Sequence, residues 1–150
     1  MAEDVIHFTH VRFGDQEVAR DKVIHFPDGI PGFEAYKVYA LFDDPDSEPF
    51  QWLLSTDNPR LGFVVVNPLF VWADYDPKIS RDDLKTLEVE KPEDILLFCI
   101  VTLADDPAHV TVNLSGPLVV NSVKHKARQL ALLDDRYVTK HKILDAIQKA

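Results

Sequence analysis

Short apolar runs, each about five to nine residues long, recur along this chain and are separated by turn-forming residues. The first run, Val5–Phe13, ends at a hairpin signal in "FGDQE", where Gly14 can take a positive φ angle at no steric cost. This spacing is typical of antiparallel strands that close into a barrel or pack as a sandwich. We predict a mainly β fold, a small antiparallel β-barrel with one or two short helices. Its strands are expected in "VIHFTHVRF", "DKVIHF", "YKVYALF", "FQWLLS", "GFVVVN", "ILLFCIVTL", "HVTVNL" and "PLVVNSV".

Two segments carry a helical pattern instead. In "DPKISRDDLKTLEVEKP", Ser80 is followed three residues later by Asp83, which resembles a capping box with Asp in place of Glu. This pattern predicts a helix of about two turns that ends before Pro92. In the tail, Thr139–Ala150, apolar residues recur at helical spacing, which predicts a short amphipathic helix.

The stretch "FPDGIPGFE", Phe26–Glu34, has two explanations, a ligand-cradling loop or an elaborate turn. A phosphate cradle needs consecutive free N–H groups at a helix start, whereas Pro27 and Pro31 remove two such donors. Pro31-Gly32 instead suits the centre of a type II turn. We predict a rigid double turn between two strands, with Ile30 and Phe33 in the core.

Composition narrows the class of protein. A chain of 150 residues fits one domain, here 1–150, and it lacks the run of about 18 apolar residues that a membrane span requires. The acidic start "MAEDVIHFTH" is unlike a secretory signal, and the single cysteine, Cys99, agrees with a reducing compartment. We therefore expect a soluble, cytoplasmic protein without a membrane partner.

The charge balance disfavours direct nucleic-acid binding. The chain contains 25 Asp and Glu against 16 Lys and Arg, a formal net charge of −9. A phosphate backbone would be repelled by this field, whereas a basic protein surface would be attracted to it. Acidity also serves solubility alone in many proteins.

Residues with catalytic or metal-binding chemistry are present, but their spacing favours neither role. The six histidines lack the companions that a metal site needs, and the serines lack a nucleophile-elbow pattern. We predict no metal, no cofactor and no enzymatic activity. The alternative is a small β-barrel enzyme that uses a carboxylate pair, which would need two acids to converge in a pocket. The dense pairs are Asp43-Asp44, Asp82-Asp83, Asp105-Asp106 and Asp134-Asp135.

The segment "NPLFVWADYDP", Asn67–Pro77, is the strongest candidate for a binding surface. Its apolar residues are too crowded to alternate cleanly between two faces, so we expect one or two of them to be exposed. An exposed aromatic side chain near Asp57, Asp74 and Asp76 has the composition of a protein-binding hot spot with an acidic rim. The other interpretation is a covered loop that fills the barrel mouth.

Four motifs, in this order and spacing, make the chain resemble the FliW family of flagellar assembly factors. They are "FPDGIPGFE", "PFQWLLSTD", "GFVVVNPLFVWADY" and "TVNLSGPLVVN" followed by "RQLAL", and they span roughly Val23 to Leu132. The resemblance implies a non-enzymatic barrel that binds two proteins. One is the translational repressor CsrA, which the family antagonises non-competitively. The other is flagellin, bound near its C-terminal region. An alternative within flagellar biology is a structural component, for which the chain lacks assembly-forming helices.

The motifs and the composition together give a set of expected contact residues. The aromatic and acidic residues of the segment Asn67–Pro77 should lie at the centre of the interface, and polar residues outside this segment at its rim. The expected contacts are Phe70, Trp72, Asp74 and Tyr75, with Asp57, Asn58 and Asn113 at the rim.

Overall fold

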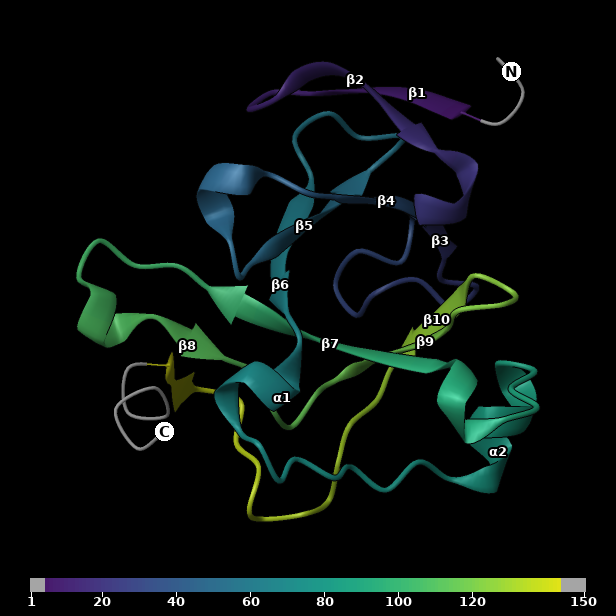
Figure 1. The fold of residues 1–150 in the computed structure, drawn as a ribbon, viewed down its shortest axis with the longest axis vertical. Coiled ribbons are helices and arrows are strands. Elements are labelled where there is room, and N and C mark those ends of the chain that lie inside the picture. Colours follow the sequence, from purple (N-terminus) through teal and green to yellow (C-terminus); the bar gives the residue numbers. More distant parts are fainter. Residues whose placement is uncertain (1–4, 144–150) are drawn as a thin grey trace.

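The computed structural model of the protein describes residues 5–143 (Figure 1). The strands are β1 (Val5–His10), β2 (Gly14–Ala19), β3 (Val23–His25), β4 (Val38–Phe42), β5 (Gln51–Ser55), β6 (Gly62–Val66), β7 (Ile95–Thr102), β8 (Thr111–Val112), β9 (Leu118–Asn121), β10 (Lys126–Gln129) and β11 (His141–Lys142). The α-helices are α1 (Pro68–Val71) and α2 (Arg81–Thr86). Single 3-10 turns occur at η2 (Arg20–Lys22), η3 (Pro45–Ser47), η4 (Pro92–Asp94) and η5 (Pro107–His109).

Seven strands form a closed barrel in the order β3-β4-β5-β6-β7-β9-β10, which confirms the predicted fold class. The long strand β7 makes closure possible, because its first half pairs with β9 and its end pairs with β8. The ring closes where β10 meets β3, through the parallel pair Lys126↔His25. This seam is the one parallel pairing in the described sheet, so the barrel is not antiparallel throughout.

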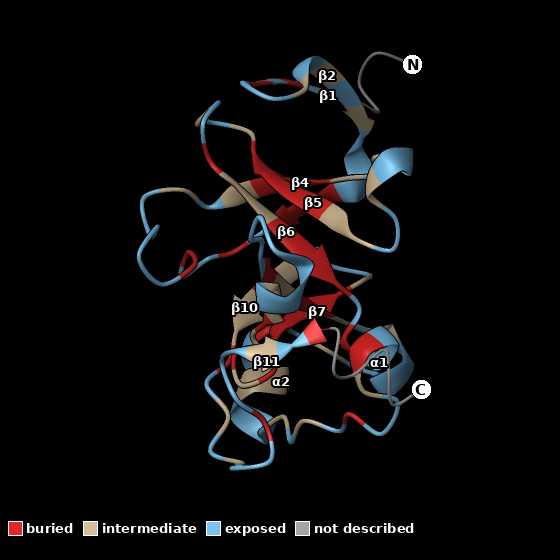
Figure 2. Cartoon of the chain, turned by 90° about the vertical axis from the view of Figure 1, so that its left-hand side faces the viewer, coloured by how far each residue is buried: buried red, intermediate tan, exposed pale blue. Residues whose placement is uncertain are grey.

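The barrel strands are buried on both faces, which explains their continuous apolar runs (Figure 2). One set of side chains comes from all seven ring strands and fills the barrel interior; it includes Ile24, Leu41, Leu53, Val65, Phe98, Val120 and Ala127. Neighbouring residues point outward into a second cluster, which the β1–β2 hairpin, α1 and the C-terminal segment cover. In β6, for example, Val65 lies in the interior cluster and Val64 and Val66 lie in the outer one.

The first hairpin is a separate sheet of two strands, not a barrel strand as the sequence suggested. Its turn spans Val11–Phe13, and Gly14 follows with a φ of +72° opposite His10. Phe13 packs edge-on against Trp52 on the outer face of the barrel, at 5.2 Å between ring centroids. The hairpin is held to the barrel by such side-chain contacts and by one backbone hydrogen bond from its turn, in which Val11 N donates to Pro59 O at 2.8 Å.

The stretch Phe26–Glu34 forms two successive turns, as predicted. Gly29 N donates to Phe26 O at 2.8 Å, and Phe33 N donates to Ile30 O at 2.7 Å. Gly32 has a φ of +90°, as the third position of a type II turn requires. Ile30 is buried, but Phe33 is 41% exposed, so its predicted core position is wrong. Phe33 is the last residue of the second turn, and its ring rests edge-on against Phe63 at 5.3 Å between ring centroids.

Helix α2 begins as predicted, because the Ser80 hydroxyl oxygen accepts from Asp83 N at 3.0 Å. Asp83 also binds Arg128 of β10, at 2.9 Å between Oδ1 and Nη1. At the other end of α2, buried Asn121 donates to the carbonyl oxygens of Leu87 and Glu88. The helix is thus attached at both ends to the β9–β10 hairpin.

Four strands and α-helices were not predicted, namely β2, α1, β10 and β11, and the hairpin turn predicted at Phe13–Glu17 lies earlier, at residues 11–13. The predicted C-terminal helix lies mostly in residues 144–150, outside the described part of the chain, and His141–Lys142 of that segment form a strand. Within residues 5–143, no helix is long and apolar enough to span a bilayer.

Candidate functional site

The one-turn helix α1 presents two apolar side chains to solvent. Asn67 caps it by accepting from Leu69 N at 3.0 Å, and Pro68 occupies its first position. Residues three apart share a helix face, so Pro68 and Val71 are both buried. The residues between them face outward: Leu69 is 51% exposed and Phe70 is 56% exposed. The Asn-Pro pair is the local signal that could have predicted this helix.

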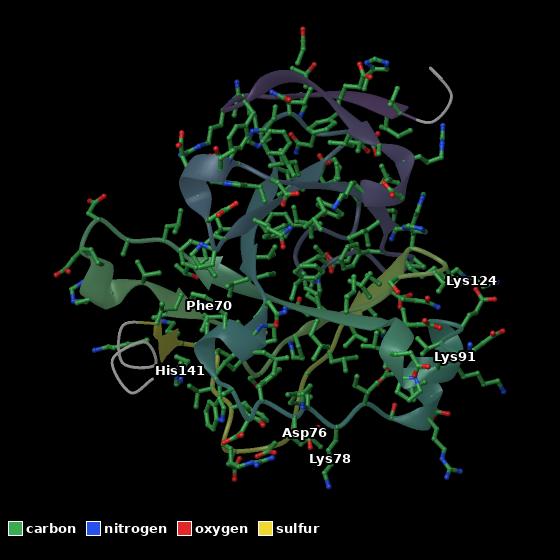
Figure 3. The ribbon with its side chains drawn as sticks, in the orientation of Figure 1. Phe70, Asp76, Lys78, Lys91, Lys124 and His141 are labelled. Atoms are coloured by element: carbon green, nitrogen blue, oxygen red, sulfur yellow. The ribbon has the colours of Figure 1, made fainter. Side chains whose placement is uncertain are left out.

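Trp72 follows α1 and is half-buried against the C-terminal segment. Its ring meets Tyr137 edge-on at 5.1 Å and lies 5.7 Å from His141 of β11. Tyr137 and His141 were not predicted as site residues, because they are more than sixty positions away in the chain. We call the surface formed by Leu69, Phe70, Trp72 and His141 the aromatic surface; Phe70 and His141 are labelled on the same side of the molecule in Figure 3.

Tyr75 is a core residue, so its predicted place at the surface is wrong. Its hydroxyl donates to Leu114 O at 2.6 Å, and its ring packs on Tyr137 at 4.6 Å. Burial raises the pKa of Tyr75 far above its usual range, and the neighbouring Cys99 thiol adds to this increase. The pKa of Cys99 is raised by burial to about 12, so this thiol is unreactive.

The predicted acidic residue Asp74 is exposed beside the aromatic surface, and so is Asp76. The backbone N–H of Asp76 donates to the Tyr137 hydroxyl at 2.9 Å, which fixes this part of the chain to the C-terminal segment. We call Asp74 and Asp76, the exposed acidic residues that follow Trp72 in the chain, the acidic border. The Arg136 guanidinium lies over the Tyr137 ring at 5.1 Å and interacts electrostatically with Asp76, so this border also has a cation nearby.

Asp57 and Asn58 do not belong to this surface. They lie in the turn between β5 and β6, whereas α1 follows the opposite end of β6. Ser55 Oγ accepts from the N–H groups of both residues, and the Asn58 side chain accepts from Arg60 N. Five residues of extended strand separate this turn from α1, a distance of about 16 Å along β6. Closeness in the sequence therefore did not mean closeness in space.

Asn113 lies next to the buried residues that support the aromatic surface. Its side-chain oxygen accepts from Gly116 N at 2.8 Å, and its own N–H donates to Ile100 O. The residue after it, Leu114, accepts the Tyr75 hydrogen bond. Asn113 is half-buried and builds the turn that supports Tyr75.

Each carboxylate pair has at least one member with a structural partner; in Asp105-Asp106 it is Asp106, whose carboxylate accepts from Ala108 N at 2.9 Å. Asp43 and Asp44 border a depression of about 490 Å³ together with Glu48. Asp43 accepts from Gln51 Nε2 at 2.6 Å, and Asp44 accepts from Ser47 Oγ and caps the 3-10 turn η3. Asp83 binds Arg128, and the Asp134 carboxylate binds Arg136, which lowers the pKa of Asp134 to about 2. Among residues 5–143, no group of three or more metal-ligating side chains is close enough to hold an ion.

A closed barrel filled by its own side chains, with an apolar and acidic surface beside α1, defines a small β-barrel protein whose outer surface is the candidate binding site. The model of the family described as "FliW protein" matches residues 7–143, and the chain belongs to the FliW family of flagellar assembly factors. The resemblance found in the sequence motifs is thereby confirmed.

Individual relatives agree with this assignment. The flagellar assembly factor FliW of Alkaliphilus metalliredigens is 41% identical over 138 residues, which cover 91% of this chain and 85% of that protein. The flagellar assembly factor FliW of Treponema denticola is 39% identical over 134 residues, covering 89% and 90% of the two chains. A crystal structure of the flagellar assembly factor FliW superposes with a TM-score of 0.83 at 32% identity, covering 92% of this chain and 96% of that one.

Proposed function

We propose that this protein acts in the cytoplasm, where it binds CsrA and flagellin in turn. It thereby couples the synthesis of flagellin to its export. While flagellin occupies it, CsrA is free to repress translation of flagellin mRNA. When flagellin leaves, the protein binds CsrA and relieves the repression. It also acts as a chaperone by covering flagellin near its C-terminal region.

The observation that carries this proposal is the exposed Phe70 on a rigid support. Asn67 and Pro68 fix α1, and the outer-face cluster holds Val71, so Phe70 is presented to a partner without a large ordering cost. An exposed aromatic side chain with a polar rim is the usual composition of an interface hot spot. The identity of the expected partners follows from what the resemblance of the sequence motifs implies.

The acidity of the chain supports the CsrA half of the proposal. An RNA-binding protein carries basic surface, and a partner with a net charge of −9 attracts it and speeds the encounter. Asp74 and Asp76 place some of this charge beside the aromatic surface. We infer a non-competitive action, in which this protein binds away from the RNA surface of CsrA and its charge repels RNA from the complex.

The test is co-purification with CsrA and with flagellin separately, followed by competition between the two. The proposal requires that each partner binds alone and that flagellin releases CsrA when added in excess. A stable ternary complex would refute the exclusive switch, and failure to bind either protein at micromolar concentration would refute the function.

A further inference from the structure

The turn of the first hairpin carries a second exposed surface, distant from the aromatic surface. The hairpin crosses the top of the molecule in Figure 1, whereas α1 lies in the lower half. At the turn, Val11 is 67% exposed, and Arg12 is exposed beside it. We call Val11, Arg12, Phe13 and Phe42 the hairpin-tip surface. The proposed partner switch makes no use of these residues.

The Arg12 side chain is stacked on two aromatic rings. Its guanidinium carbon lies 4.9 Å from the centroid of the Trp52 ring and 5.7 Å from that of Phe13. The rings also support one another, because the Phe13 centroid lies 5.2 Å from that of Trp52 and 4.7 Å from that of Phe42. A guanidinium that rests on an aromatic ring can still donate its N–H groups to a planar acceptor. The rings thus position the Arg12 cation without using up its donors.

The backbone of the turn is fixed as well. Val11 N donates to Pro59 O at 2.8 Å, which joins the turn to the loop between β5 and β6. Arg12 N donates to Nδ1 of the buried His10 at 3.1 Å. Ordering a long side chain is one of the main costs of binding a partner. Because Arg12 is already held by its rings and its backbone, this cost is small here.

No carboxylate of residues 5–143 forms an ion pair with Arg12. The acids near the turn accept hydrogen bonds from other groups. Asp15 accepts from Thr9 Oγ1 at 2.7 Å. Asp44 accepts from Ser47 Oγ at 2.8 Å, and the same hydroxyl accepts from the Trp52 indole. A partner's carboxylate can therefore bind Arg12 without displacing a carboxylate of this chain.

We propose that the hairpin-tip surface binds an acidic, partly apolar segment of another protein, whose carboxylate pairs with the Arg12 guanidinium. Guanidinium–carboxylate pairs are often bidentate and belong to the strong, charge-assisted hydrogen bonds. Arginine and large aromatic residues dominate the energetics of protein interfaces, and Val11 adds exposed apolar area beside Arg12. A nucleic acid also offers anionic groups, but a long polyanion would meet the field of a chain with a net charge of −9. A short acidic segment meets mainly the local charge of Arg12.

The experiment is an NMR titration of the ¹⁵N-labelled full-length protein at low ionic strength with two synthetic peptides. One is N-acetyl-Leu-Phe-Glu-Glu-Leu-amide, and the other has glutamine in place of both glutamates. We expect saturable shifts from the first peptide at the amides of residues 10–14 and at the Trp52 indole N–H. The glutamine peptide should bind at least about tenfold more weakly, because its amides cannot form a charge-assisted pair with Arg12. This comparison uses the unaltered protein, so it does not depend on the folding of a variant.

Arg12→Gln should weaken binding of the acidic peptide at least about tenfold. The matched control is Arg81→Gln, which makes the same change at an exposed arginine of α2 and should leave the affinity unchanged. Equal affinities for the two peptides, an equal loss in both variants, or no saturation at millimolar concentration would overturn the proposal.

Two further titrations exclude other occupants. Inorganic phosphate that binds at the same amides more tightly than the acidic peptide would refute a protein segment as the occupant. Shifts at residues 10–14 that depend on protein concentration without peptide would assign the surface to a second copy of this chain. CsrA and flagellin are absent from all of these titrations, so their outcome is independent of the proposed partner switch.

Discussion

The Tyr75 hydroxyl donates a 2.6 Å hydrogen bond to the carbonyl oxygen of Leu114, 39 residues further along the chain. This bond joins the segment after α1 to the turn after β8, and Tyr137 packs on the same ring. It therefore fixes the support on which the aromatic surface is built. Its loss would leave the Leu114 carbonyl buried without this donor.

Tyr75→Phe is expected to lower the free energy of unfolding by about 1–2 kcal/mol, because a buried acceptor loses its partner while the ring packing is retained. Chemical denaturation measures this change through the transition midpoint at constant m-value. A variant as stable as the parent would show that the hydrogen bond contributes nothing net.

Tyr39→Phe provides the opposite case. The Tyr39 ring lies in the barrel interior, and its hydroxyl has no hydrogen-bond partner among the described residues. Burial raises the pKa of this phenol to about 12. Removing the hydroxyl should leave the free energy of unfolding unchanged or raise it by up to about 1 kcal/mol, since an unsatisfied buried group is deleted. A loss as large as that expected for Tyr75→Phe would contradict this view of the interior.

His10 should make the stability of the protein depend on pH. It is buried between the first hairpin and β6, where its Nδ1 accepts from Arg12 N at 3.1 Å. Burial, and secondarily the charge of Arg12, lowers the pKa of His10 below its ordinary value of 6.5. As the pH falls below 6.5, the unfolded chain takes up this proton before the folded one. The contribution of His10 to stability is therefore complete above pH 6.5 and declines below it.

The variant His10→Asn retains an acceptor for Arg12 N and removes the titration. Denaturation midpoints measured between pH 5 and pH 8 should depend less on pH than those of the parent. His7→Asn is the matched control, because His7 is exposed on the same strand. Parallel pH profiles for the parent and His10→Asn would assign the dependence to other groups.

Phe70→Ala should weaken binding of CsrA at least tenfold, about 1.4 kcal/mol, if the aromatic surface is the interface. Phe70 is a sharper probe than Trp72, because Trp72 also packs on Tyr137 and its removal would disturb the fold. Asp74→Lys, which reverses a charge at the acidic border, should mainly slow association. Calorimetric titration measures the affinity and stopped-flow mixing measures the rate. Phe33→Ala, which removes an exposed aromatic ring from another surface, should bind normally.

The elements that depend on local chemistry could be predicted from the sequence. Turn residues between apolar runs located β3 to β9, and Ser80 with Asp83 located the start of α2. Pro31-Gly32 determined a type II turn, since proline fixes φ and glycine permits a positive value. These features depend on neighbours within a few residues, and the family motifs consist of the same stretches.

Only the tertiary structure decided which side chains of the Asn67–Pro77 segment reach solvent. A helical turn rotates about 100° per residue, so Phe70 faces outward while the adjacent Val71 is buried. Tyr75 is buried because Leu114 and Tyr137, distant in sequence, provide a hydrogen-bond acceptor and a packing surface. Asp57 and Asn58 are separated from this site because β6 runs between them. Closure of the barrel likewise depends on β7 pairing with β9 and on β10 pairing with β3, and no local pattern specifies such long-range contacts.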